Sequence, residues 1–128
     1  MAVAITITVG LMAVLGSHTA DSRGPKVVRT SPSPGAVIAP GFFTLSVTFD
    51  KPMADGSFSY VQKAHGTFPD CGFPARLSDD KRTFAVRCSV LPSRNYEIWF
   101  NSRPYMNFKD LNGISAEPHQ LLFRTRVR

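Results

Sequence analysis

The clearest structural signal in the chain is the stretch Phe43-Thr44-Leu45-Ser46-Val47-Thr48-Phe49, in which apolar and hydroxyl side chains alternate without a break. Alternation with a period of two places one kind of side chain on each face of a β-strand. One apolar face and one polar face are typical of an antiparallel sheet that covers a core on one side only. We therefore expect a half-buried antiparallel strand over residues 43–49.

The same alternation returns along the rest of the chain, over residues 84–88, 96–100 and 121–125. Shorter strands are expected near residues 26–29, 58–60 and 73–77, and turn-forming residues separate the runs. No stretch has a helical period, and no internal repeat is present. About seven short strands at this spacing predict an all-β fold, a sandwich of antiparallel strands.

The N-terminal segment is apolar or small and carries no charged side chain before Asp21. This pattern predicts a signal peptide over residues 1–20 and one mature domain over residues 21–128, secreted or periplasmic. No Lys or Arg precedes the apolar run, which is unusual for a signal peptide. An uncleaved N-terminal membrane anchor is therefore the alternative, and the only membrane contact that we expect.

The charge of the chain is +6, from 15 basic and 9 acidic residues. Such a balance can attract acidic partners, but a well-solvated surface is the simpler interpretation. Export argues against nucleic acid as the partner.

The two cysteines, Cys71 and Cys88, are expected to meet an oxidising compartment, where one disulfide can form. Cys88 shares the apolar phase of Phe84 and Val86, so it should point inward, whereas Cys71 is expected in a loop. An inward cysteine and a loop cysteine need not be within reach of each other. A Cys71–Cys88 bridge and two unpaired thiols therefore both stay open.

The order of two motifs resembles a known family. Residues 27–36 read VVRTSPSPGA and residues 45–53 read LSVTFDKPM, which is similar to the opening of the bacterial Ig-like domain named after the surface-layer protein SbsA. The resemblance continues to about residue 126. It implies an immunoglobulin-like sandwich, an extracytoplasmic location and a structural or binding role without catalysis or a cofactor.

The opening also resembles CopC, a periplasmic copper-binding protein with a similar sandwich. That resemblance implies copper binding through an N-terminal histidine and further His or Met residues. His18 would become N-terminal only if cleavage followed Ser17, and the other histidines are His65 and His119. Met53 already fits the SbsA-type motif, so copper binding is the alternative function and not the first.

Catalytic motifs are missing from the sequence. It contains no Gly-x-Ser-x-Gly elbow, and no histidine has a recognisable acidic partner. The segment 110–113, Asp-Leu-Asn-Gly, lacks the further acidic ligands of a calcium loop, so we expect an Asx turn there. Tyr96, at the start of a strand after Pro92, is expected to bond its hydroxyl to nearby backbone. We expect a protein that is not an enzyme.

The binding surface is expected to include Trp99, which should face outward because Ile98 and Phe100 take the inward phase. Arg124 and Arg126 take the outward phase of the last strand, which pairs with the strand of Trp99 in the immunoglobulin topology. A second candidate surface is the 102–118 connection.

We expect Tyr105 and Met106 of that connection to contact the partner, a protein or glycan of the cell envelope. We expect the domain itself to be monomeric or weakly associating. Trp99 has an alternative role, covering the sheet through a cation–π contact with an arginine.

Overall fold

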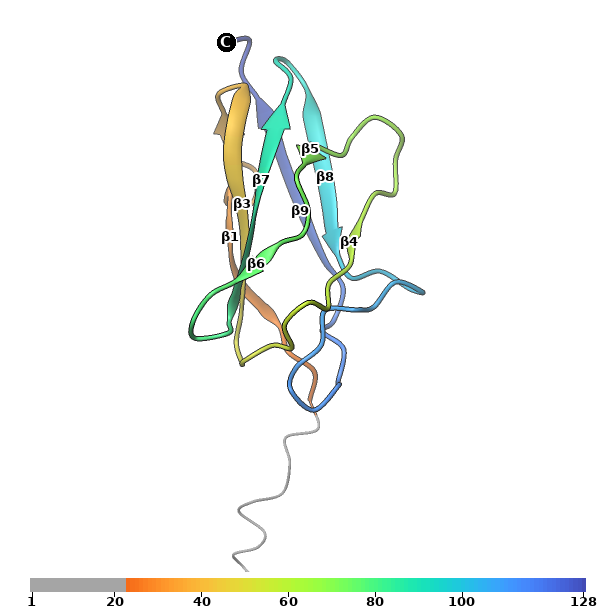
Figure 1. Cartoon of the computed structure of the whole chain (residues 1–128). Helices are drawn as coiled ribbons and strands as arrows, with labels where there is room; N and C mark the ends of the chain where they lie inside the picture. The colour runs from red at the N-terminus through yellow and green to blue at the C-terminus, as the bar shows by residue number, and fades with distance from the viewer. Residues whose placement is uncertain (1–22) are drawn as a thin grey trace, which may run out of the picture.

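Nine strands and no helix form over residues 23–128, the part of the chain that this computed structural model describes (Figure 1). The expected signal peptide lies outside these residues. One sheet has the order β1 (Val27–Ser31), β3 (Gly41–Phe49), β7 (Thr83–Val90) and β5 (Asp70–Cys71), with β6 (Arg76–Leu77) also paired to β7. The other has the order β2 (Val37–Ile38), β9 (His119–Thr125), β8 (Asn95–Phe100) and β4 (Tyr60–Val61).

This strand order is that of an immunoglobulin constant-type sandwich, ABED in one sheet and CFG in the other. The all-β immunoglobulin-like prediction is therefore confirmed, but the count of seven antiparallel strands is too low. The turn at residues 32–36 divides the first strand into β1 and β2, which lie in different sheets, and β2 pairs with β9 in parallel. Residues 72–75 divide another strand into β5 and β6.

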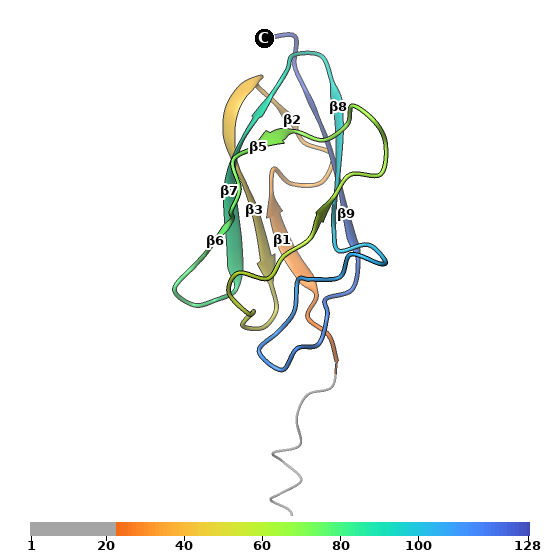
Figure 2. The ribbon, with the colours of Figure 1, turned by 45° about the vertical axis from the view of Figure 1, so that its right-hand side comes forward.

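The expected alternation holds along the long strands. Leu45, Val47 and Phe49 of β3 are buried, and Leu45 and Val47 stand opposite Val86 and Phe84 of β7. From the other sheet, β8 and β9 contribute a second set of buried side chains: Tyr96, Ile98, Phe100, Leu121 and Phe123. The core is the layer between the two sheets (Figure 2), and the fully buried Phe108 of the 102–118 connection belongs to it.

Tyr96 makes the backbone contact expected from the sequence. Its hydroxyl accepts a hydrogen bond of 2.8 Å from the backbone N–H of Leu91, and its ring stacks on Phe123 with 5.4 Å between the centroids. A tyrosine at this place in an immunoglobulin-like sandwich fixes the turn between two strands. The structural role of Tyr96 is confirmed.

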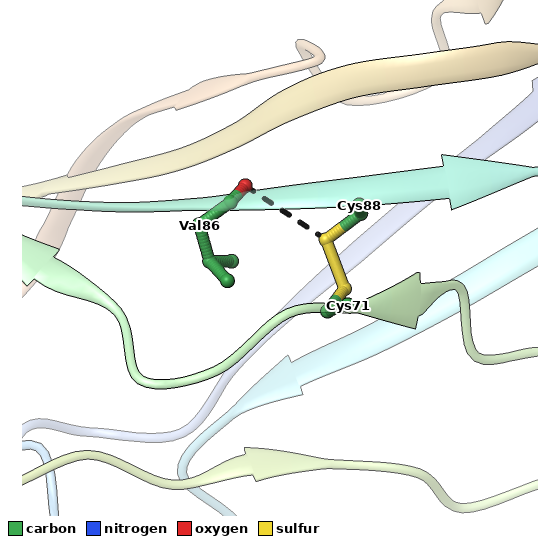
Figure 3. The surroundings of a disulfide bond; sticks show 3 residues. All are labelled: Cys71, Val86 and Cys88. Atoms are coloured by element: carbon green, nitrogen blue, oxygen red, sulfur yellow. Dashed lines mark hydrogen bonds between the residues drawn. A yellow bond between two sulfur atoms is a disulfide. The ribbon is translucent and has the colours of Figure 1, made fainter.

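Cys71 and Cys88 form a disulfide (Figure 3). Residues 70–71 are not a free loop but the short strand β5, and Cys71 stands directly opposite Cys88 of β7. The inward Cys88 is therefore close enough to bond to Cys71, because the two cysteines are on neighbouring strands of the same sheet. Its sulfur, which has no hydrogen in the bridge, lies 3.8 Å from the carbonyl oxygen of Val86.

The 102–118 connection is held by the buried Asn101. Its amide nitrogen donates to the carbonyls of Phe108 (3.0 Å) and Ala116 (2.9 Å), and its oxygen accepts from the N–H of Phe108 (2.9 Å). These bonds fold a long connection onto the end of the sandwich.

The expected Asx turn is present at Asp110, whose Oδ1 accepts from the N–H groups of Asn112 and Ile114, both at 2.9 Å. The other oxygen pairs with Lys51 at 3.1 Å. Burial raises the pKa of Asp110, but the amide bonds and the Lys51 ammonium outweigh burial and hold that pKa below its ordinary value.

Candidate functional site

An aromatic groove lies at the β4 edge of the second sheet. It has a volume of about 420 Å³ and opens to solvent. Its walls come from the segment around β4, from the link between β5 and β6, and from the 102–118 connection. The lining residues are Phe58, Ser59, Tyr60, Val61, Gln62, Phe73 and Tyr105.

Two of the groove's rings are held outward by local chain geometry. Phe73 belongs to the link that interrupts β5 and β6, so its side chain leaves the sheet and is 44% exposed. Tyr105 follows a turn closed by Ser102, whose N–H donates to the Tyr105 carbonyl at 2.9 Å, and it is 60% exposed. Exposed aromatic rings of this kind are frequent anchors for binding.

The other two rings form the floor. Phe58 stacks on Phe73 with 5.9 Å between the centroids, and Tyr60 lies 5.0 Å from Phe73. Both also contact the buried Phe108, at 6.4 Å and 5.1 Å. The floor of the groove is therefore continuous with the core, which makes it rigid.

The hydroxyl of Tyr60 is buried and has no hydrogen-bond partner, the one such buried side-chain atom of the described residues. Burial raises the pKa of Tyr60 well above its ordinary range, so the group stays protonated. Buried polar atoms without partners are rare and call for an explanation. The Tyr60 hydroxyl lies beneath the surface of the groove, so it lowers the stability of the fold and is not a donor that a ligand can reach.

The backbone of β4 adds further unused groups. The N–H of Asn101 donates to the carbonyl of Ser59 at 3.0 Å, so the polar groups of Ser59 point toward β8. Backbone groups of neighbouring residues point in opposite directions along an antiparallel strand. The N–H and C=O of Tyr60 therefore point away from β8, where β4 is the last strand of its sheet.

Trp99 lies on the outward face of β8, as expected, but it is half-buried by its neighbours. The ammonium of Lys63 lies 3.8 Å from the centroid of its ring, and its Nε1 donates to Glu97 at 3.1 Å. Gln120 donates to the same Glu97 oxygen at 2.6 Å. The cation–π contact expected for Trp99 is present, with a lysine in place of an arginine.

The expectation that arginines flank Trp99 is wrong. Trp99 stands opposite Gln120, whereas Arg124 stands opposite Asn95, four residues along β8. At the usual rise of a strand this separation is about 13 Å. Arg124 and Arg126 instead join Arg94 around an open cavity of about 320 Å³.

The two remaining candidates, Tyr105 and Met106, both belong to the 102–118 connection, but only one of them lines the groove. Tyr105 lies in the aromatic groove. Met106 is half-buried and does not line the groove, although its carbonyl accepts a hydrogen bond of 2.7 Å from Ser115. The structure thus brings Tyr105 together with residues that the sequence did not single out, Phe58, Tyr60 and Phe73.

A strand was expected near residues 73–77, but β6 begins only at Arg76, and Phe73 lies in the link before it. Ala75 is buried and Leu77 half-buried, but Phe73 precedes the strand and points into the groove. The position of the link between β5 and β6 depends on the disulfide pairing, which the sequence left open. No local signal marks Phe73 as a groove residue.

Residues 23–128 contain no group of three or more His, Cys, Asp or Glu residues placed to hold a metal ion. Met53 is fully buried in the core, His65 is exposed, and His119 is half-buried beside Phe100, where burial lowers its pKa. His18 lies outside the described residues. The same residues contain no helix that is long and apolar enough to span a membrane.

Fold and site together define an immunoglobulin-like sandwich with an aromatic groove at one sheet edge. No family model, curated protein or solved structure matches the chain. The resemblances to the SbsA-type domain and to CopC therefore stay predictions.

Proposed function

We propose that the chain is an exported, non-catalytic immunoglobulin-like binding module of the bacterial envelope or exterior, and that its aromatic groove holds an extended segment of a partner protein. The observation that carries this proposal is Tyr60. Its ring lines the groove, and its backbone N–H and C=O point away from β8 at the open edge of the sheet.

An extended peptide matches these groups better than other ligands do. A segment laid along β4 can pair with the Tyr60 backbone as an added strand, and its side chains can pack on Phe73 and Tyr105. A glycan can stack on the rings, but it lacks the regular backbone pattern that an open sheet edge selects.

Two features support the exported setting. The Cys71–Cys88 disulfide suits an oxidising compartment, and the N-terminal 20 residues have the composition of a signal peptide. The SbsA-type resemblance adds the bacterial surface as the expected location.

The test is a selection from a random dodecapeptide display library against the oxidised domain, residues 21–128. Peptides that bind are then measured against Tyr105→Ala and Phe73→Ala, with Trp99→Ala as the matched aromatic control outside the groove. We expect selected peptides to lose about tenfold or more in affinity on the groove variants and little on the control.

Two results would overturn the proposal. One is a set of peptides that bind wild type and groove variants equally. The other is a glycan array on which a glycan binds the groove tightly while no selected peptide does.

A further inference from the structure

One end of the sandwich carries exposed apolar and basic side chains that neither the core nor the aromatic groove uses. We call this end the tip and define it as residues 40–42, 91–94 and 126–128. Figures 1 and 2 both show the start of β3, the turn between β7 and β8, and the C-terminal residues at this end.

Hydrogen bonds hold the three segments of the tip together. Gly41 pairs with Val90, the residue before the 91–94 turn. The N–H of Ser93 donates to the carbonyl of Arg126 at 3.0 Å, and the N–H of Arg126 donates to the carbonyl of Ile38 at 2.9 Å. The tip is therefore a fixed surface and not a set of independent loops.

Each segment of the tip exposes a large apolar side chain. Phe42 is 74% exposed, Leu91 55% and Val127 71%. Single exposed apolar residues are ordinary, but a group of them at one end of a small domain indicates a contact surface.

The charged side chains of the tip are all basic. Arg94, Arg126 and Arg128 are exposed, and the three segments contain no Asp or Glu. Just outside the tip, the guanidinium of Arg87 lies 5.1 Å from the ring centroid of Phe42. The Nε of Arg126 makes a long hydrogen bond of 3.5 Å to the main-chain oxygen of Arg128.

One acidic side chain does lie next to the tip. Asp70 lines a cavity with Leu91 and Arg94. It stands on β5 opposite Ser89 of β7, the residue that pairs with Phe42 on the other side, so it is level with Phe42 and adds one acidic side chain at the border of the tip.

We propose that the tip binds the surface of a membrane that contains anionic lipids. Apolar side chains surrounded by arginines match the boundary between the headgroups and the acyl chains, where both kinds of side chain are stabilised. A soluble polyanion would use the arginines but would leave Phe42 and Leu91 in water. The tip shares no residue with the aromatic groove, so this binding is independent of the proposed peptide site.

The experiment is sedimentation of residues 21–128, oxidised, with vesicles of phosphatidylglycerol and phosphatidylcholine in a 1:3 ratio. Vesicles of phosphatidylcholine alone are the control for charge. We expect binding to the anionic vesicles that weakens as salt is raised, because the arginine contribution is screened. We expect little binding to the neutral vesicles.

Variants separate the apolar and basic contributions. Phe42→Ser combined with Leu91→Ser should weaken binding about tenfold or more, because the inserted apolar surface is lost. Arg94→Gln and Arg126→Gln should each weaken it about fivefold. Matched controls are Leu111→Ser, which removes a leucine that is 62% exposed in the 102–118 connection, and Arg76→Gln on β6. Both should bind as wild type does.

Thermal unfolding of each variant shows that it is folded before binding is compared. The proposal is overturned if wild type fails to sediment with anionic vesicles at low salt, or if it binds neutral vesicles equally. It is also overturned if the arginine variants lose binding while Phe42→Ser with Leu91→Ser does not, since the tip would then be a site for polyanions only.

Discussion

Replacing Tyr60 by Phe removes one oxygen from the floor of the aromatic groove and leaves the ring in place. The hydroxyl of Tyr60 is buried without a partner, and such a group costs about 1–3 kcal/mol of folding free energy. We therefore expect Tyr60→Phe to raise the free energy of unfolding by about 1 kcal/mol or more at pH 8. A groove-bound peptide should bind Tyr60→Phe as it binds wild type, because the buried hydroxyl does not reach the groove surface.

The pH dependence of this difference has a defined sign. Burial raises the pKa of Tyr60 above the ordinary value of a tyrosine, about 10, which the unfolded chain retains. In wild type the contribution of the neutral hydroxyl is fully present below pH 10 and is lost as the pH rises further, because the unfolded state releases the proton first. The advantage of Tyr60→Phe should therefore grow by about 1 kcal/mol between pH 8 and pH 11.

Urea unfolding of the oxidised proteins at both pH values measures the effect, with an unchanged slope required for the comparison. Tyr105→Phe is the matched control, because its hydroxyl belongs to an exposed side chain and its loss should change stability little. Destabilisation by 1 kcal/mol or more in Tyr60→Phe at pH 8 would show that the hydroxyl is satisfied in the free protein. The interpretation of Tyr60 as a buried, unpaired hydroxyl would then be wrong.

Three further predictions concern what holds the groove in place. Cys71→Ala with Cys88→Ala should lower the free energy of unfolding by about 3 kcal/mol in the chain-entropy model for a separation of 17 residues, measured by urea unfolding; a loss below 1 kcal/mol would contradict that estimate. Asn101→Ala should lower the free energy of unfolding by about 3 kcal/mol, because it leaves buried backbone groups of the 102–118 connection unpaired. Hydrogen exchange should become faster across that connection, and unchanged exchange would contradict the role of Asn101 in holding it. The lowered pKa of Asp110 contributes stability that is present above about pH 4 and is lost as the pH falls through the folded value. The stability difference between wild type and Asp110→Asn should therefore shrink from pH 5 to pH 2 in thermal unfolding, and a constant difference would rule out this contribution.

The sequence predicted the long strands because burial on one face imposes a period of two. Leu45 and Val47 of β3, and Ile98 and Phe100 of β8, lie on the face that alternation assigns to them. The face of Trp99 was predictable for the same reason. Its neighbours were not, since alternation fixes the face of a residue but not the register of the next strand.

The groove could not be predicted from the sequence, for a related reason. It forms where three segments meet that are far apart in the chain, near Tyr60, Phe73 and Tyr105. Each segment is short, and the course of the second depends on the pairing of Cys71 with Cys88. Tyr105 was singled out as an aromatic residue of a long connection, but nothing local could show that it faces Phe73 across a groove.

The most direct test of groove binding is hydrogen exchange at the backbone amide of Tyr60, with and without a peptide from the library selection. If an extended segment adds to β4, this N–H gains a hydrogen bond, and its exchange should slow by about tenfold or more at saturating peptide. Exchange that stays unchanged at Tyr60 while it slows on the outer face around Trp99 would contradict binding in the groove and would place the partner on the sheet face instead.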